Sequence, residues 1–164
     1  MFSSHLFRVP LGVPFFLLSA LLCICASAWA EEAIVRQRVE GGDFQAVHEA
    51  LVEVIEAEGM VVGQILPFGA MLERTGAGEP GGVYRQAEII QSCSASLAHR
   101  MALEDPGQIV FCPLSIAVYV KASEPESVII AYRALGDGSP VRIEADALLA
   151  RLVGRAAQLG KLRW

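Results

Sequence analysis

The amino-terminal segment of this 164-residue chain is unlike everything that follows it. Arg8 is its only formally charged side chain, and an uncharged, largely apolar run extends from Val9 to Ala30. A short basic region, an apolar stretch and small residues at Ala28 and Ala30 form the pattern of a secretory signal peptide with an A-x-A cleavage site. We therefore expect cleavage after Ala30, with Ala28 as the second choice, and a single domain at residues 31–164 that folds outside the cytoplasm.

The same segment allows two other interpretations. Its uncharged run approaches the length of a membrane-spanning helix, so an uncleaved anchor is one alternative, which Pro10 and Pro14 disfavour. Arg8 would place the rest of such a chain across the membrane as well. A lipoprotein signal is the other alternative, but Cys23 and Cys25 each follow a large aliphatic residue. We expect a periplasmic or secreted protein that meets the membrane only transiently, through its signal peptide.

The net charge of the predicted mature domain limits the kinds of molecule that it can bind. The chain has 13 Lys plus Arg and 18 Asp plus Glu, and cleavage would remove Arg8 and no acid. The mature domain would then hold 12 basic and 18 acidic residues, a net charge of −6. Nucleic acids and anionic lipids are bound by clustered positive charge, which a mildly acidic domain lacks. We expect no nucleic-acid partner, and either a small ligand or a periplasmic protein as the partner.

Hydrophobic periodicity predicts the order of helices and strands. Residues 44–59 are a predicted helix, because Asp43 can cap it, apolar residues recur at three- and four-residue steps, and Gly59 can end it. This order predicts an α+β sandwich in which helices cover one face of a mostly antiparallel sheet. Further helices are predicted at 94–103 and 144–159, strands at 33–39, 60–66, 84–90, 109–120 and 127–135, a helical turn or strand continuation at 68–74, a loop at 76–82 and a turn at 124–126.

One part of the sequence resembles a known family. The segments Cys93 to Ala98, Asp105 to Gly107 and Val110 to Tyr119 look like the core pattern of the prokaryotic domain of unknown function 302 family. The helix at 44–59 also matches, so the resemblance covers most of residues 33–135. It implies a compact α+β fold similar to the TATA-binding-protein-like class and, for exported members, a periplasmic location, but no agreed activity. The chain departs from the pattern in having serine after the first cysteine, where asparagine is usual, and in having Cys112 before a proline instead of after one.

Cys93 and Cys112 are the only cysteines in the predicted mature domain. An even count in an oxidising compartment predicts a structural disulfide, which would close a loop of about 20 residues and stabilise the fold by about 3 kcal/mol. As free thiols they suggest other chemistry, because a thiolate at a helix start is favoured and can act as a nucleophile or a soft-metal ligand. His99 and Met101 are then candidates for further ligands to copper or haem iron. Simple burial in the core is a third interpretation.

Other catalytic patterns are absent from the sequence. It contains no hydrolase nucleophile motif, no C-x-x-C pair and no phosphate-cradling glycine motif. His48 lies among glutamates and is expected to be solvated. We therefore expect an exported, non-enzymatic binding or accessory domain that encloses a small apolar pocket or presents a surface to a partner. The alternative is a periplasmic protein that uses Cys93 and Cys112 for thiol redox chemistry or to handle a metal or haem.

Overall fold

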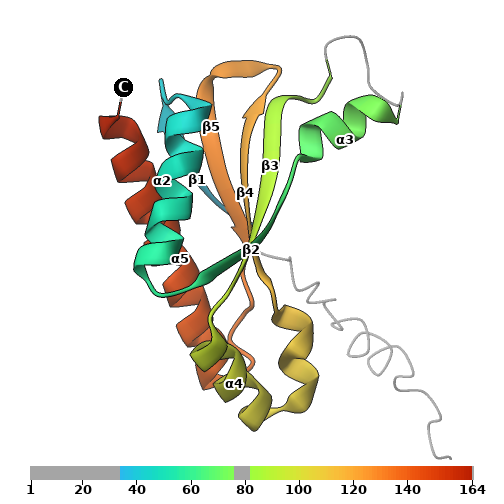
Figure 1. The fold of residues 1–164 in the computed structure, drawn as a ribbon, viewed down its shortest axis with the longest axis vertical. Helices are drawn as coiled ribbons and strands as arrows, with labels where there is room; N and C mark the ends of the chain where they lie inside the picture. Colours follow the sequence, from blue (N-terminus) through green and yellow to red (C-terminus); the bar gives the residue numbers. More distant parts are fainter. Residues whose placement is uncertain (1–33, 76–81, 164) are drawn as a thin grey trace, which may run out of the picture. The chain divides into compact units, whose positions relative to one another are not determined.

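The computed structural model describes residues 34–75 and 82–163. The predicted signal peptide at 1–30 and most of the predicted loop at 76–82 lie outside the described residues. None of the helices in the described ranges is both long enough and apolar enough to cross a membrane. The elements, shown in Figure 1, are β1 (Ile34–Glu40), α2 (Phe44–Ala57), β2 (Val61–Leu66), α3 (Phe68–Arg74), β3 (Tyr84–Cys93), α4 (Ala95–Glu104), the 3-10 helix η1 (Pro106–Phe111), β4 (Leu114–Lys121), β5 (Glu124–Arg133) and α5 (Pro140–Leu162).

The strands form one sheet in the order β1-β5-β4-β3-β2, and every neighbouring pair is antiparallel. β4 and β5 form the predicted hairpin. β1 lies at one edge beside β5, with pairs from Ile34–Arg133 to Glu40–Ser127, whereas β2 lies at the opposite edge. The first strand of the chain, β1, is therefore paired with the last strand, β5. This antiparallel sheet with helices packed on it confirms the predicted α+β class.

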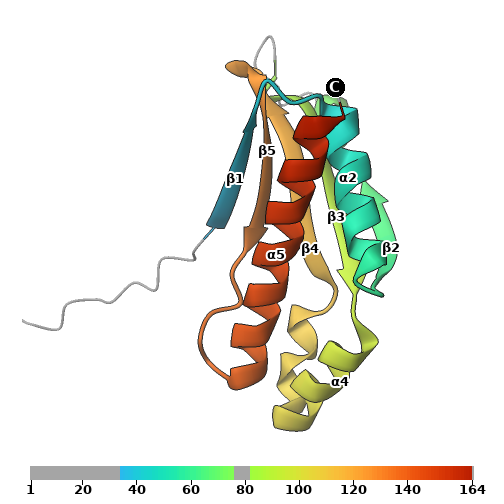
Figure 2. The ribbon, with the colours of Figure 1, turned by 90° about the vertical axis from the view of Figure 1, so that its left-hand side faces the viewer.

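α2 and α5 lie side by side on one face of the sheet (Figure 2). The predicted cap of α2 is present, since the Asp43 carboxylate accepts a hydrogen bond of 2.8 Å from the Ala46 N–H. Gly59 follows α2 with φ of 71°, the left-handed conformation that favours glycine after a helix. The core between this helix layer and the sheet includes Phe44, Val47, Leu51, Val54, Ile55, Ile90, Ile116, Val118, Val128, Ile130, Leu149, Leu152 and Val153.

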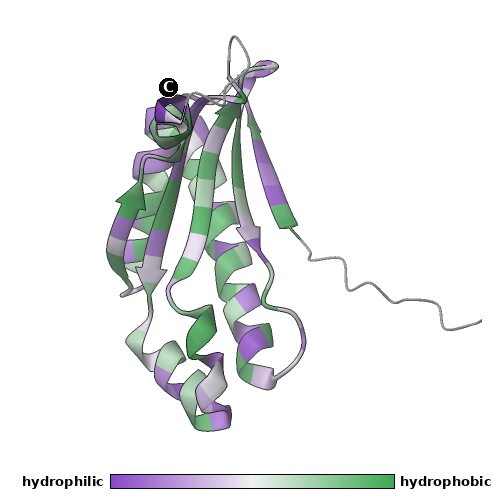
Figure 3. Ribbon diagram, turned by 90° about the vertical axis from the view of Figure 1, so that its right-hand side faces the viewer, coloured by the Kyte–Doolittle hydropathy of each residue, from purple (hydrophilic) through white to green (hydrophobic). Residues whose placement is uncertain are grey.

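The other face of the sheet carries the short helix α3, which packs over β3 (Figures 1 and 3). Two β5 side chains on this face remain buried, Ile129 at 3% and Ala131 at 6% exposure. Ile129 pairs with Tyr119 on β4 and with Arg38 on β1, and these larger side chains flank it. We call this side the open face; the strand register places on it Ile34, Arg36, Arg38, Ala87, Ile89, Ala117, Tyr119, Ile129, Ala131 and Arg133.

The strand predicted at 109–120 is wrong at its beginning, because residues 106–111 form η1 and β4 starts at Leu114. The Asp105 carboxylate accepts a hydrogen bond of 2.8 Å from the Gly107 N–H, which caps a new helical turn. Ile109 and Val110 are 72% and 74% exposed, so no strand neighbour buries them. Their β propensity was therefore overridden by the local turn chemistry.

Two other elements begin earlier than predicted. Glu124 begins β5, and the chain turns at residues 122–123 instead of 124–126. The ammonium of Lys121 lies 3.0 Å from the Glu124 carboxylate across this tight hairpin. α5 begins at Pro140 instead of residue 144, and the Ser139 hydroxyl accepts a hydrogen bond of 3.2 Å from the Arg142 N–H. Proline is tolerated there because the first N–H groups of a helix have no helical acceptor.

Candidate functional site

Cys93 and Cys112 meet where β3 and β4 leave the sheet. β3 ends at Cys93, and the preceding Ser92 pairs with Leu114 at the start of β4. Cys112 precedes Leu114 by two residues and is joined to Pro113 by a cis peptide bond. The two side chains are half-buried free thiols in hydrogen-bonding contact with each other. The structure thus brings the two sequence-predicted residues together, and the disulfide between them stays a prediction.

The surroundings of Cys112 favour its neutral form. Burial raises the pKa of the Cys112 thiol, because a thiolate there would lose hydration. The charge and the hydrogen bond of Cys93 raise the same pKa further. Cys112 is therefore protonated at neutral pH, and it becomes a strong nucleophile only when its proton is removed.

The segment that precedes Cys112 is anchored on the amino-terminal end of α5. The Arg142 guanidinium lies 4.7 Å from the centroid of the Phe111 ring, a cation–π contact, and it also donates a hydrogen bond to the Leu135 carbonyl. The Asp146 carboxylate accepts hydrogen bonds of 2.7 and 2.9 Å from the N–H groups of Leu135 and the following glycine. These contacts hold the end of η1, and with it Cys112, in a defined position beside Cys93.

The other two candidate ligands lie in different environments. His99 is exposed on α4, whereas Met101 is 1% exposed and belongs to the hydrophobic core. Within residues 34–75 and 82–163, no group of three or more His, Cys, Asp and Glu side chains is arranged to hold a metal ion. The structure gives no support to a ligand set made of Cys93, His99 and Met101.

The prediction that His48 is solvated is wrong, because its side chain lies between α2 and the sheet. Its Nδ1 is 2.7 Å from Oε2 of Glu88 on β3, and the two side chains are 13% and 30% exposed. The sequence carried a signal for this position, because His48 follows Phe44 by four residues and precedes Leu51 by three. That spacing places it on the apolar stripe of α2.

A hollow of about 310 Å³ lies on the open face. Three alanines from adjacent strands make its floor, because Ala87 pairs with Tyr119, and Ala117 pairs with Ala131. Aromatic rings form one wall. The centroid of the Tyr84 ring lies 6.3 Å from that of Phe68 and 5.4 Å from that of Tyr119. The residues that line the hollow also include Ile34, Arg36, Glu88, Ile89, Tyr132 and Arg133.

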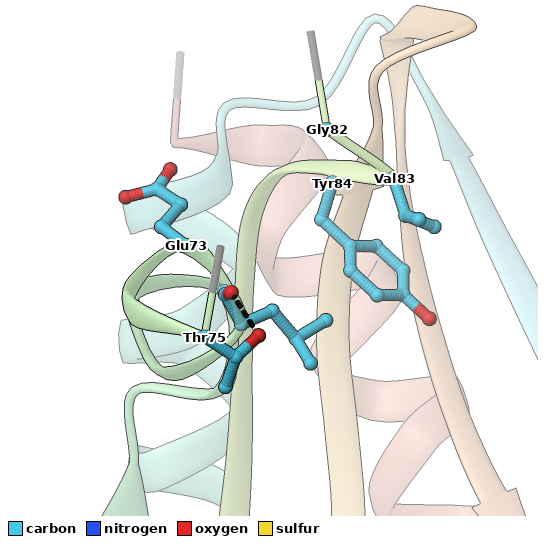
Figure 4. A pocket seen from close by; sticks show the side chains of 7 residues that line it. Glu73, Thr75, Gly82, Val83 and Tyr84 are labelled. Atoms are coloured by element: carbon cyan, nitrogen blue, oxygen red, sulfur yellow. Dashed lines mark hydrogen bonds between the residues drawn. The ribbon is translucent and has the colours of Figure 1, made fainter. Parts of the chain in front are cut away.

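A smaller hollow of about 170 Å³ lies between α3 and the start of β3 (Figure 4). The Thr75 hydroxyl, at the end of α3, donates a hydrogen bond of 2.7 Å to the Leu72 carbonyl beside it. The chain between Thr75 and Gly82 lies outside the described residues, so we assign this hollow no function. Its lining residues are Gly69, Leu72, Glu73, Thr75, Gly82, Val83 and Tyr84.

Comparison with known families agrees with this architecture. Residues 35–155 match the family described as "Domain of unknown function DUF302". The chain belongs to this family. Both cysteines and most of the open-face hollow lie inside the DUF302 match.

A solved DUF302 structure has the same fold. It is the crystal structure of an uncharacterized conserved protein DUF302 from Bacillus stearothermophilus, with a TM-score of 0.63 and 18% sequence identity. The alignment covers 75% of this chain and 97% of that one. No curated protein matches the chain. At this identity the similarity supports the DUF302 fold and carries no activity with it.

Proposed function

We propose that this DUF302 chain is an exported accessory domain that binds a small amphipathic anion in the hollow of its open face. The observation that carries the proposal is the combination of an apolar floor, an aromatic wall and a guanidinium at one edge. The volume of about 310 Å³ lies at the lower end of the range of about 300–1,000 Å³ typical of small-molecule sites. The chemistry described is reversible binding, and no catalytic group is required.

The apolar part of such a ligand would lie against the alanines and rings. Ala117 and Ala131 are opposite each other, so no large side chain fills the space between them and the rings of Tyr84 and Tyr119. Aromatic side chains bury much apolar surface and keep their rings in few orientations. A flat hydrocarbon or aromatic skeleton therefore fits this wall better than a polar one.

The guanidinium of Arg36 makes the hollow prefer a negatively charged ligand. In the part of the chain that the structure describes, its guanidinium donates to the Ile34 carbonyl at 3.2 Å and pairs with no carboxylate. Arg38 differs, because Glu124 Oε2 lies 2.5 Å from it. The acidic residue that also lines the hollow, Glu88, contacts His48. Arg36 can therefore pair with an anionic ligand without displacing an existing salt bridge.

Two fluorescent probes test this proposal. 8-Anilinonaphthalene-1-sulfonate and N-phenyl-1-naphthylamine share an aromatic skeleton, but only the first carries a sulfonate. We expect the sulfonate to bind more tightly. Because hydrogen bonds to charged groups contribute about 1.5–3 kcal/mol, Arg36→Gln should weaken sulfonate binding about tenfold or more and leave the neutral probe nearly unchanged. Fluorescence titration of the folded protein measures both affinities.

Filling the hollow should remove binding of both probes. Ala117→Leu places a larger side chain on the floor, whereas Ala150→Leu adds the same atoms to the exposed side of α5. We expect at least a tenfold loss of affinity for the first variant and none for the second, with circular dichroism confirming that both are folded. Equal binding to both variants, or equal affinity for the two probes in the native protein, would contradict the proposed site.

Export is supported by the sequence of residues 1–30 and has its own test. When the gene is expressed with its natural amino terminus, the protein recovered from the periplasmic or secreted fraction should begin at Glu31. Replacing both Ala28 and Ala30 by leucine should block cleavage, because the peptidase requires small residues at these positions. Mass spectrometry of the fractions distinguishes the outcomes, and full-length wild-type protein confined to the cytoplasm would refute export.

A further inference from the structure

We propose that Cys93 and Cys112 form a thiol–disulfide exchange site, separate from the ligand hollow, that reacts reversibly with disulfides. The two thiols are in contact at the end of the β3–β4 ladder. They lie on the two chain segments that bound the excursion of α4 and η1 away from the sheet. Figure 1 shows this excursion beyond one end of the sheet.

The surrounding fold holds the pair without depending on a covalent bond. Ser92–Leu114 is the last of a continuous series of β3–β4 pairs, so the backbones that carry the thiols are already neighbours. The excursion is tied independently to α5, since Arg100 makes two hydrogen bonds of 2.8 and 2.6 Å to the Glu144 carboxylate. The bond between the sulfurs can therefore form or break while the sheet and helices stay in place.

The partial solvent exposure of the two thiols also favours a reactive pair over a permanently buried one. Both cysteines are half-buried, so a small disulfide can approach from solvent. Two residues of η1 near Cys112 are also exposed, Ile109 at 72% and Val110 at 74%. A structural disulfide of a small domain is usually shielded and hard to reduce, whereas exposed pairs are the labile ones.

The chemistry is a balanced two-electron exchange. The Cys93 thiolate attacks one sulfur of a disulfide RSSR, the S–S bond breaks, and one RS⁻ leaves with the bonding pair and takes up a proton. The Cys112 thiol then gives its proton to solvent, and its sulfur attacks Sγ of Cys93. This second step releases the other RS⁻, which is protonated in turn. The two thiols and RSSR become the Cys93–Cys112 disulfide and two RSH, so the protein is oxidised and the reagent is reduced.

Cys93 is the first nucleophile in this scheme. The raised pKa of Cys112 keeps that sulfur protonated at neutral pH, and thiolate is the attacking species. Cys112 is instead placed to resolve the mixed disulfide, because its thiol already contacts Cys93.

Oxidised glutathione is the probe that tests the proposal on the folded wild-type protein. After acid quenching, peptide mapping should find the Cys93–Cys112 disulfide, and excess reduced glutathione in native buffer should regenerate both thiols. In Cys112→Ser, which lacks the resolving sulfur, a glutathione adduct should accumulate on Cys93. In Cys93→Ser, burial still raises the pKa of Cys112, so the adduct on Cys112 should form at least tenfold more slowly at pH 7 than the Cys93 adduct of Cys112→Ser, and faster as the pH rises.

Two results would overturn the proposal. One is a pair that reacts with oxidised glutathione only in denaturant. The other is a disulfide that, once formed, resists reduced glutathione in native buffer, since the bond is then structural. Both measurements use the wild-type chain and do not depend on whether the serine variants fold. They are also independent of probe binding in the hollow, so either proposal can fail alone.

Discussion

Truncation of Ile129 to alanine is expected to lower the free energy of unfolding by about 2–5 kcal/mol, as much as truncation of Ile130. The two residues are neighbours on β5 and point to opposite faces of the sheet. Ile130 lies under α2 and α5 and is fully buried, but Ile129 lies on the open face and is only 3% exposed. Loss of its methyl and methylene groups would leave a cavity between Tyr119 and Arg38, which pair with it.

Urea unfolding of the two variants measures this effect, with Ile65→Ala as the matched control. Ile65 is on the edge strand β2 and is 39% exposed, so its truncation should cost less than about 1 kcal/mol. If Ile129→Ala behaves like the control and unlike Ile130→Ala, the open face is solvated along its centre.

Gly160→Ala and Gly154→Ala should change stability in opposite directions, although both lie on α5. A Cβ at residue 160 would lie 2.8 Å from Cγ2 and 2.9 Å from Cα of Val47, so α2 and α5 would have to separate. We expect a loss of about 1–3 kcal/mol from this overpacking. A Cβ at residue 154 would have no atom within 4 Å, and alanine there should stabilise the helix by about 0.5–1 kcal/mol.

Thermal and urea unfolding of these two variants provide the measurement. Each serves as the control for the other, because the substitution and the helix are the same and only the contact with Val47 differs. A stabilised Gly160→Ala protein would show that the helices are not in backbone contact at this point. A destabilised Gly154→Ala protein would mean that something packs against α5 where the structure has open space.

Local chemistry was enough to predict several elements. The helix that begins after Asp43 is one of them. Its capping residue and its terminal glycine lie directly beside the helix in the sequence, so local sequence alone indicates where the helix begins and ends. The helix predicted at 94–103 likewise agrees with α4 to within one residue at each end. Prediction failed at Ile109 and Val110, whose β propensity had no strand neighbour to satisfy it, and at Glu124, where hairpin pairing extended the strand into an expected turn.

The candidate sites depended more on long-range contacts. Cys93 and Cys112 could be named because they are the only cysteines after the predicted signal peptide, but their contact depends on the β3–β4 register. The hollow could not be found from the sequence, since its alanines are ordinary residues on three separate strands. His48 was assigned to solvent because its partner, Glu88, is on a strand far along the chain.

For this protein, the sequence alone was sufficient for the α+β class, the DUF302 resemblance, the main helices and the two cysteines worth testing. The α+β class and the main helices depend on periodicity and capping, which act over a few residues, whereas the DUF302 resemblance depends on short matching segments of sequence. The pairing of strands in the tertiary structure was required to place β1 beside β5, to bury Ile129 although it lies on the open face, and to bring the two thiols into contact. The physical reason is that register and burial depend on which strands become neighbours, and that choice is made by side chains distant in the chain.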